Sequence, residues 1–570
     1  MTDVQPRPGT TARGSTATGA STVVQEAQRR RSIAVISHPD AGKSTLTEAL
    51  ALHAHAIDRA GAVHGKGGRA GTVSDWLEIE RTRGISITSA ALQFEYGDHM
   101  INLLDTPGHA DFSEDTYRVL TAVDAAIMLL DASKGLEPQT LKLFDVCRRR
   151  GVPVITFVNK WDRPGKAVLE LCDELEQRIG LRPTPLSWPI GEAGRFVGLL
   201  NRADASVRTY RKTPGGANLA EETYFTAADA ARELGEDYET AYDEAHLLDP
   251  VDRASFLAGK TTPLLFGAAL ANIGVKQLLD TVLELAPAPR AQPVDNSSVD
   301  IASAADAGPG NAGTADAGAD AGPGSVAARE IDTPFSGFVF KIQAGMDRNH
   351  RDHLAYIRVC SGRFERGMVV THERTGRPFA TKYAQSVFGR DRETIEEAFP
   401  GDVVGLVNAS NLTVGDTLFD PDGAPVRFPA MPAFAPEHFA VASVRDPGRS
   451  KQFRKAIEQL EQEGVVQVLV SEGRGDANPI LAAVGPLQFE VAQFRMEHEF
   501  GAPMRLETMG LSLARMVKPE DLDAVRASHI EVARRRDGAW LALLRDIWHA
   551  RGFERSHPDT QLISLDASEG

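Results

Sequence analysis

Residues 37–44 read Ser37-His38-Pro39-Asp40-Ala41-Gly42-Lys43-Ser44, between the apolar run 33–36 and a helix-like stretch at 45–52. This order predicts a strand, a tight loop and the start of a helix. Such a loop directs consecutive backbone N–H groups at a phosphate, and the helix N-terminus adds positive potential. We expect Lys43 to reach the β- and γ-phosphates and Ser44 to bind Mg²⁺. Ser37 stands where loops of this kind usually have a glycine, so this stretch alone is a weaker match than GxxxxGK[ST].

A second segment, Asp105-Thr106-Pro107-Gly108-His109, follows the apolar run 100–104. An aspartate at the end of a strand beside such a loop holds Mg²⁺, often through water. The backbone N–H of Gly108 is expected to sense the γ-phosphate. His109 is the candidate catalytic residue, because a side chain there projects toward the attacking water; whether it acts as a base or only orients that water stays open.

Two more segments follow strands and indicate which base is bound. Asn159-Lys160-Trp161-Asp162 follows the run 153–158, and Asp162 is expected to accept hydrogen bonds from the N1–H and 2-amino group of guanine. Adenine lacks that pair of donors, so GTP and GDP are selected over ATP. After the run 263–266, the backbone N–H groups of Ala268, Ala269 and Leu270 are expected to hold the guanine O6. In a further loop, 83–88, Ser86 is expected to give its hydroxyl to Mg²⁺.

Each motif has a purely structural interpretation. Asp105 could cap a helix, Asn159 could be a turn residue, Ser86 could lie in a plain strand, and His109 could be a surface or capping histidine. The order of the motifs, each after an apolar strand, makes the set much more specific than any member. The sequence therefore predicts a GTP site with Mg²⁺.

The predicted architecture is α/β and multidomain. Apolar runs alternating with helical patterns favour a P-loop GTPase domain with a mostly parallel sheet, at 29–290, with an inserted subdomain at about 165–260 because the spacing from Asp162 to Ala268 is long. Residues 1–28 are rich in Thr, Gly and Ser and are expected to form a disordered leader. Residues 291–331 are expected to be a flexible linker, since 302–328 is almost entirely Ala, Gly, Asp, Pro and Ser.

Beyond the linker the pattern changes. Short strands with glycine turns predict a β-barrel domain at 332–428. Between 439 and 507 the order of patterns is strand, helix, strand, strand, helix, strand, which is the split ferredoxin-like arrangement. We therefore expect a ferredoxin-like α+β domain at 429–570, with a helical tail after Leu511.

The bulk composition limits the class of protein. The chain has 570 residues, a formal net charge of −16 and three cysteines, Cys147, Cys172 and Cys360. Three widely spaced cysteines exclude a disulfide framework and fit a reducing cytoplasm. The apolar runs are too short to span a membrane, and no secretory signal is evident. The charge argues against non-specific coating of nucleic acid, although the arginine runs 29–31, 148–150 and 534–536 are candidate docking patches or plain solvated surface.

The motifs carry a family resemblance. Asp105 to His109 and Arg83-Gly84-Ile85 resemble the translational GTPases, the group containing elongation factors Tu and G. Within that group, segments 37–44, 74–76, 83–88 and 187–191 resemble the bacterial release factor 3 family, in which Ser37 and Ser86 are expected. Three features depart from it: the long, low-complexity linker, the similar leader, and Trp161 in place of a smaller apolar residue. The indole of Trp161 should point back toward the core.

The resemblance implies a ribosome-stimulated GTPase of translation termination. Its partners would be the ribosome, through rRNA and ribosomal proteins, and class I release factors, which it would help to dissociate after peptide release. It would act as a cytoplasmic monomer without a membrane partner. Two alternatives stay open: another ribosomal GTPase, of elongation or ribosome-protection type, and a GTP-gated ribosome-binding regulator. The short C-terminus argues against the first.

Overall fold

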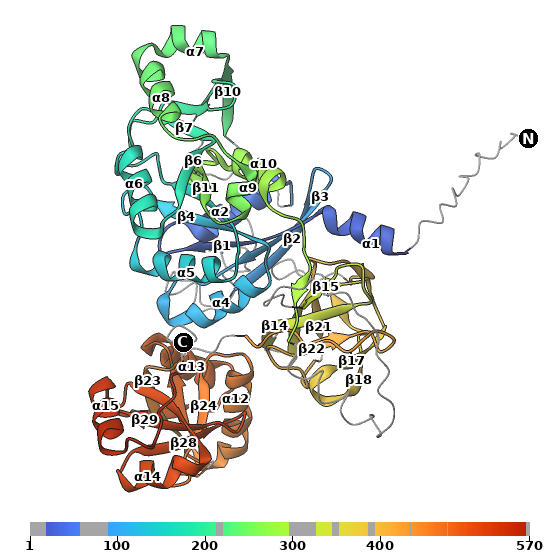
Figure 1. Ribbon diagram of the computed structural model, residues 1–570, viewed down its shortest axis with the longest axis vertical. Helices are drawn as coiled ribbons and strands as arrows, with labels where there is room; N and C mark the ends of the chain where they lie inside the picture. The colour runs from blue at the N-terminus through green and yellow to red at the C-terminus, as the bar shows by residue number, and fades with distance from the viewer. Residues whose placement is uncertain are drawn as a thin grey trace, which may run out of the picture.

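The computed structural model describes residues 19–56, 89–211, 220–295, 327–344, 353–385, 394–407, 409–431, 435–475 and 477–565. Three folded units follow one another along the chain (Figure 1). The predicted fold class is confirmed: a mostly parallel α/β domain, an antiparallel β unit and a ferredoxin-like α+β domain. In the described part of the chain, none of the helices has the length and apolar character needed to cross a membrane.

The first unit is built on a seven-stranded sheet in the order β2-β3-β1-β4-β5-β11-β6. Only the β2–β3 pair is antiparallel; the other five neighbouring pairs are parallel. The carboxyl ends of parallel strands meet at one edge, so the residues that follow β1, β3, β5 and β11 are brought together there. The strands are β1 (Arg30–Ser37), β2 (Ala90–Tyr96), β3 (His99–Asp105), β4 (Ala125–Asp131), β5 (Val154–Asn159), β6 (Arg182–Pro185) and β11 (Thr261–Phe266).

Helices cover both faces of this sheet, because each central strand is buried on both sides. One core layer contains apolar residues of α4 (Ser113–Thr121), α5 (Pro138–Arg149) and α6 (Val168–Ile179). The other contains those of α2 (Lys43–His53) and α10 (Val275–Leu285). Because apolar side chains pack on both faces, the sheet is rigid and the loops at its carboxyl edge are held in place.

The inserted subdomain is smaller than expected. It begins after β6, because α6 packs into the main core and β6 pairs in parallel with β11. Its antiparallel sheet has the order β10-β9-β8-β7 and projects from the top of the first unit in Figure 1 with two helices. The elements are β7 (Ser187–Ile190), β8 (Gly198–Asn201), β9 (Val207–Arg211), β10 (Glu221–Phe225), α7 (Ala227–Leu234) and α8 (Glu236–His246); α9 (Arg253–Leu257) then leads back to β11.

The expected leader and linker are both partly structured. Gly19–Gln28 forms α1, in which Val23 and Ala27 are buried, so the disordered leader is wrong for this stretch. At the expected linker, β12 (Gln292–Pro293) pairs with β13 (Ala328–Arg329), which brings its two ends together. Residues 1–18 and 296–326, which hold the rest of both predictions, lie outside the described residues.

The second unit is a half-barrel of antiparallel strands around one apolar cluster. Its strand order is β18-β17-β22-β14-β15-β21-β19, with β16 and β20 forming a separate pair. The strands are β14 (Ser336–Ala344), β15 (His353–Ser361), β16 (Phe364–Glu365), β17 (Val369–His372), β18 (Arg377–Ala380), β19 (Ala384–Gln385), β20 (Glu397–Ala398), β21 (Val403–Val407) and β22 (Thr417–Phe419).

Buried polar contacts join the half-barrel to the first unit. Arg30 Nε donates to Asp402 Oδ2 at 2.7 Å, and Arg358 Nη2 donates to Asp124 Oδ1 at 2.7 Å. All four side chains are buried. Each of these buried charged side chains has its partner in the other unit. Docking in a different orientation would leave buried charges unpaired, so these contacts favour one orientation.

The third unit has the predicted order of elements, and its strands β26-β23-β25-β24 are adjacent as the ferredoxin-like arrangement requires. The helical tail is wrong: three further strands extend the same sheet from β24 through β28 and β29 to β27. A strand at the edge of a sheet has backbone N–H and C=O groups that an added strand can pair with. That pairing depends on the neighbouring strand and cannot be seen in the local sequence pattern. The elements are β23 (His438–Val444), α12 (Ser450–Gln462), β24 (Gln467–Val470), β25 (Ile480–Ala483), α13 (Pro486–His498), β26 (Met504–Thr508), β27 (Leu513–Val517), α14 (Leu522–Ala527), β28 (Glu531–Arg535), β29 (Trp540–Leu544) and α15 (Ile547–Ser556).

Candidate nucleotide site

The loop between β1 and α2 is shaped by two left-handed residues. Asp40 has φ 66° and Gly42 has φ 99°. A Cβ on Gly42 would lie 2.5 Å from Asn159 Nδ2, so both the dihedral angle and the space require glycine. Helix α2 begins at Lys43, and the partial positive charge at a helix N-terminus gives this end of the loop a positive potential.

Lys43 and Asp105 form the charged pair at the base of this loop. Lys43 Nζ donates to Asp105 Oδ1 at 2.7 Å, and both side chains are buried. The pair joins the start of α2 to the end of β3. The lysine that we expect to reach the phosphates therefore lies beside the carboxylate expected at Mg²⁺.

Asn159 ties the phosphate loop to the loop after β11. Its Nδ2 donates to the carbonyl oxygen of Ala41 at 2.8 Å, and its Oδ1 accepts from the N–H of Ala269 at 2.8 Å. The side chain is almost fully buried. Three loops that are far apart in the sequence are thus held in one arrangement by one amide.

Lys160 has φ 64° and reaches across the phosphate loop. Its Nζ donates to Asp131 Oδ2 at 2.8 Å and to the carbonyl oxygen of Asp40. Burial raises the pKa of Asp131, but hydrogen bonds from Lys160 and Ser133 outweigh it and hold that pKa below its ordinary value. The ionised carboxylate therefore anchors Lys160 over the loop.

The segment after β3 is anchored on both sides. Thr106 Oγ1 donates to the carbonyl oxygen of Val35 at 2.7 Å, and Thr116 Oγ1 donates to that of Pro107 at 3.2 Å. Gly108 lies against Pro39 of the phosphate loop. The turn η1 (Ala110–Phe112) then begins, and His109 Nδ1 lies 3.2 Å from Asp111 Oδ1.

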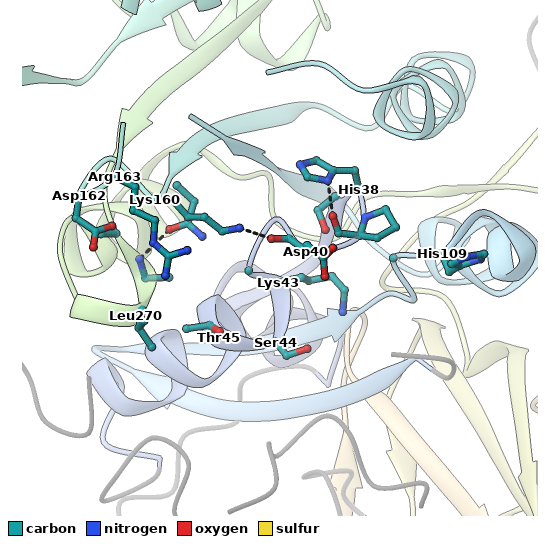
Figure 2. A pocket seen from close by; sticks show the side chains of 17 residues that line it. His38, Asp40, Lys43, Ser44, Thr45, His109, Lys160, Asp162, Arg163 and Leu270 are labelled. Atoms are coloured by element: carbon teal, nitrogen blue, oxygen red, sulfur yellow. Dashed lines mark hydrogen bonds between the residues drawn. The ribbon is translucent and has the colours of Figure 1, made fainter. Parts of the chain in front are cut away.

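These loops enclose a cavity of about 480 Å³. In Figure 2, Asp162 lies at one end, with Arg163 and Leu270, and His109 lies at the other, apart from the labelled phosphate-loop side chains. The lining residues are Ser37, His38, Pro39, Asp40, Gly42, Lys43, Ser44, Thr45, Gly108, His109, Asn159, Lys160, Asp162, Arg163, Ala268, Ala269 and Leu270. A base-recognition end and a phosphate end are thereby separated along one cavity.

Most predicted site residues therefore meet in one place. Asp105 does not line the cavity but contacts Lys43, which does. Ala41, Thr106 and Pro107 do not line it either, and they make hydrogen bonds that hold the surrounding loops in place. Ser86 lies outside the described residues. Sequence reasoning missed Thr45 and Arg163 as lining residues, although each directly follows a motif residue, and missed Asp131 as the partner of Lys160.

Trp161 is buried with its ring in an edge-to-face contact with Phe266 at 5.1 Å between centroids. The prediction that this indole points into the core is confirmed. His38 is also buried and lies against Glu137 and its own neighbour Pro39. Burial lowers the pKa of His38, so its ring is a neutral packing element of the loop at pH 7.

Comparison with known proteins covers all three units. Residues 28–288 match the elongation factor Tu GTP binding domain, 334–420 match elongation factor G domain 2, and 428–554 match the class II release factor RF3 C-terminal domain. A peptide chain release factor 3 from Gloeobacter violaceus is 45% identical over 555 residues, 95% of this chain and 99% of that protein. The chain belongs to the peptide chain release factor 3 family. Another member, from Synechococcus elongatus, is 44% identical and covers 95% of this chain and 94% of its own.

A solved structure from Thermus thermophilus has the same fold, with a TM-score of 0.65 at 21% identity. It covers 86% of this chain and 69% of that one. Family membership makes the chain a GTPase of translation termination that binds GTP and GDP.

Magnesium fits the donors at the phosphate end. Ser44 lines the cavity directly after Lys43, and the Asp105 carboxylate lies within 2.7 Å of Lys43 Nζ. Hydroxyl and carboxylate oxygens are ligands that Mg²⁺ prefers, and Mg²⁺ in such sites uses few protein ligands beside phosphate oxygens and water. Ser44 lies in the first turn of α2, which follows β1, and Asp105 is the last residue of β3, the parallel neighbour of β1.

Proposed function

We propose that this release factor 3 family member is a ribosome-dependent GTPase that promotes dissociation of class I release factors from the ribosome after peptide release. The observation that carries the proposal is a single cavity lined both by Asp162, a carboxylate placed to recognise guanine, and by the phosphate loop. The chain also aligns with a peptide chain release factor 3 over nearly the full length of both proteins. The ribosome and the class I factor are its proposed partners, in the cytoplasm.

Asp162 selects the base. Its carboxylate lies at the cavity end opposite His109, the same end as Leu270 (Figure 2). It accepts the N1–H and 2-amino group of guanine. The N–H groups of Ala268 and Ala269 already donate to the Ile273 carbonyl oxygen and to Asn159 Oδ1, so the expectation that they hold O6 is wrong, and we assign O6 to the N–H of Leu270. A base without those donors would leave the carboxylate unpaired in a confined site, which is costly.

The phosphate end carries the chemistry. Lys43 stabilises the charge on the β- and γ-phosphates, while the α2 N-terminus and the loop N–H groups hold them in line. Ser44 and Asp105 hold Mg²⁺, with Ser86 as a third proposed ligand, and the ion neutralises phosphate charge when it is bound. His109 positions the attacking water once it turns toward the γ-phosphate.

Hydrolysis then switches the protein. The N–H of Gly108 contacts the γ-phosphate only in the GTP state, so loss of that phosphate releases the segment that follows β3. The ribosome stimulates hydrolysis by completing the site around His109. His109→Ala is expected to abolish most of the ribosome-stimulated rate while leaving GTP binding near normal.

A post-termination ribosome assay tests the proposal. Ribosomes carrying a labelled class I release factor after peptide release are mixed with the protein and GTP, a non-hydrolysable GTP analogue, or no nucleotide. We expect loss of the labelled factor that depends on guanine nucleotide. No nucleotide-dependent loss would exclude the release role, and equal loss without nucleotide would indicate a binding protein instead. Stimulation of translocation in a parallel assay would indicate an elongation-type GTPase.

A further inference from the structure

The turn that follows His109 contacts the C-terminal unit through one carboxylate. Asp111 Oδ2 accepts from the backbone N–H of Leu487 at 2.7 Å, across 376 positions of sequence. Leu487 lies in the first turn of α13, and that turn contains no acidic residue of its own. Asp111 therefore supplies the negative charge that a helix N-terminus favours, from another domain.

The same carboxylate also holds His109. His109 Nδ1 lies 3.2 Å from Asp111 Oδ1, to which it donates when it carries the ring proton. When Nδ1 carries no proton, it accepts from the Asp111 backbone N–H at 3.3 Å. One oxygen thus faces the imidazole and the other faces α13. Figure 2 shows this imidazole apart from the labelled phosphate-loop side chains of His38, Asp40 and Lys43. His109 lines the cavity, and its ring is tied to the turn that α13 contacts.

Close packing supports this contact. Phe112 and Val491 are both buried and form one apolar cluster between η1 and α13. A Cβ on Gly485 would overlap the Asp111 carboxyl group. Gly485 has φ −145°, an extended conformation open to any residue, so its small size rather than its dihedral angle suits the interface. Figure 1 shows α13 on the side of the C-terminal unit that faces α4.

We propose that Asp111 is a positioning residue that makes the C-terminal unit a restraint on GTP hydrolysis. While α13 is seated on η1, the carboxylate keeps His109 beside the turn. Separation of α13 from η1 frees His109 to approach the γ-phosphate. This inference rests on the proposed role of His109 in hydrolysis. A partner that moves the C-terminal unit would thereby change the position of His109 and the rate of GTP hydrolysis.

Gly485→Ala in the full chain tests the restraint from the side that does not touch the nucleotide site. We expect a several-fold rise in kcat for GTP hydrolysis without ribosomes, an unchanged KM, and faster hydrogen exchange at the Leu487 amide. Asp111→Ala should give the same rise. Gly510→Ala is the matched control, since no atom lies within 4 Å of a Cβ there.

The outcomes separate the two proposals. Unchanged kcat in both Gly485→Ala and Asp111→Ala, relative to Gly510→Ala, would overturn the restraint. A rise that persists in Gly485→Ala/His109→Ala would overturn the role of His109 and with it this inference, while the release activity measured on ribosomes could still stand. A rise that disappears in that double variant supports both.

Discussion

Asn159 donates a 2.8 Å hydrogen bond to the carbonyl oxygen of Ala41, so the base-recognition motif and the phosphate loop are built as one unit. The other end of the same amide accepts from Ala269. Asn159 therefore fixes two of the loops around the cavity that it also lines. The cavity keeps its shape because this buried amide is satisfied at both ends.

Asn159→Ala is expected to weaken GDP and GTP binding together. It leaves the Ala41 carbonyl and the Ala269 N–H without their buried partner, which costs about 1–3 kcal/mol for each group. Equilibrium binding of a fluorescent GDP analogue measures the loss. Asn201→Ala, on β8 in the inserted subdomain, is the control and should bind normally. Full affinity in Asn159→Ala would contradict the linking role.

Asp162→Asn is expected to reverse the base preference. An amide cannot accept both guanine donors, but its NH₂ group can donate to the 2-oxo group of xanthine. GTP hydrolysis should fall by at least about 100-fold in kcat/KM, and XTP hydrolysis should rise, because one unpaired buried group is worth that much discrimination. Competition between GTP and XTP in one reaction gives the ratio directly. An unchanged ratio would exclude Asp162 as the base-selecting residue.

Arg358→Ala is expected to destabilise the junction between the first two units. It leaves Asp124 as a buried carboxylate without its guanidinium partner, which costs about 3–5 kcal/mol. The midpoint of urea unfolding should fall clearly. Arg366→Ala is the control, because its ion pair with Glu396 is exposed and worth at most about 1 kcal/mol. The double variant Arg358→Met/Asp124→Leu should recover most of the loss, since no charge is left unpaired.

The nucleotide site could be predicted from sequence because its residues follow strands. Ser37, Asp105 and Asn159 end β1, β3 and β5, and parallel strands bring such positions to one edge whatever the loops contain. The Asp111–Leu487 contact could not be predicted. It depends on how two domains dock, and no local pattern near either residue records the other.

The tail shows the same limit within a domain. Leu513–Val517 and Glu531–Arg535 are five-residue strands, too short for a clear alternation, and the second is a strand because β24 offers it an unpaired edge. The prediction for the leader is wrong for a related reason. Helix α1 is stabilised by burial of Val23 and Ala27, while its composition of Gly, Ser and Thr indicates disorder.

Asp416→Asn is expected to lower stability near neutral pH but not in acid. Burial raises the pKa of Asp416, yet hydrogen bonds from Arg374 and the Thr413 N–H outweigh it and hold that pKa below its ordinary value. A lowered folded-state pKa stabilises the fold above the unfolded-state pKa of about 3.9, and that contribution is lost as pH falls through the lower folded-state pKa. Urea unfolding from pH 7 to pH 3 should therefore show a gap between wild type and variant that is constant above about pH 5 and shrinks below about pH 4. Asp422→Asn, at an exposed position nearby, should leave the gap near zero throughout. A gap that grows in acid would contradict the sign of the shift.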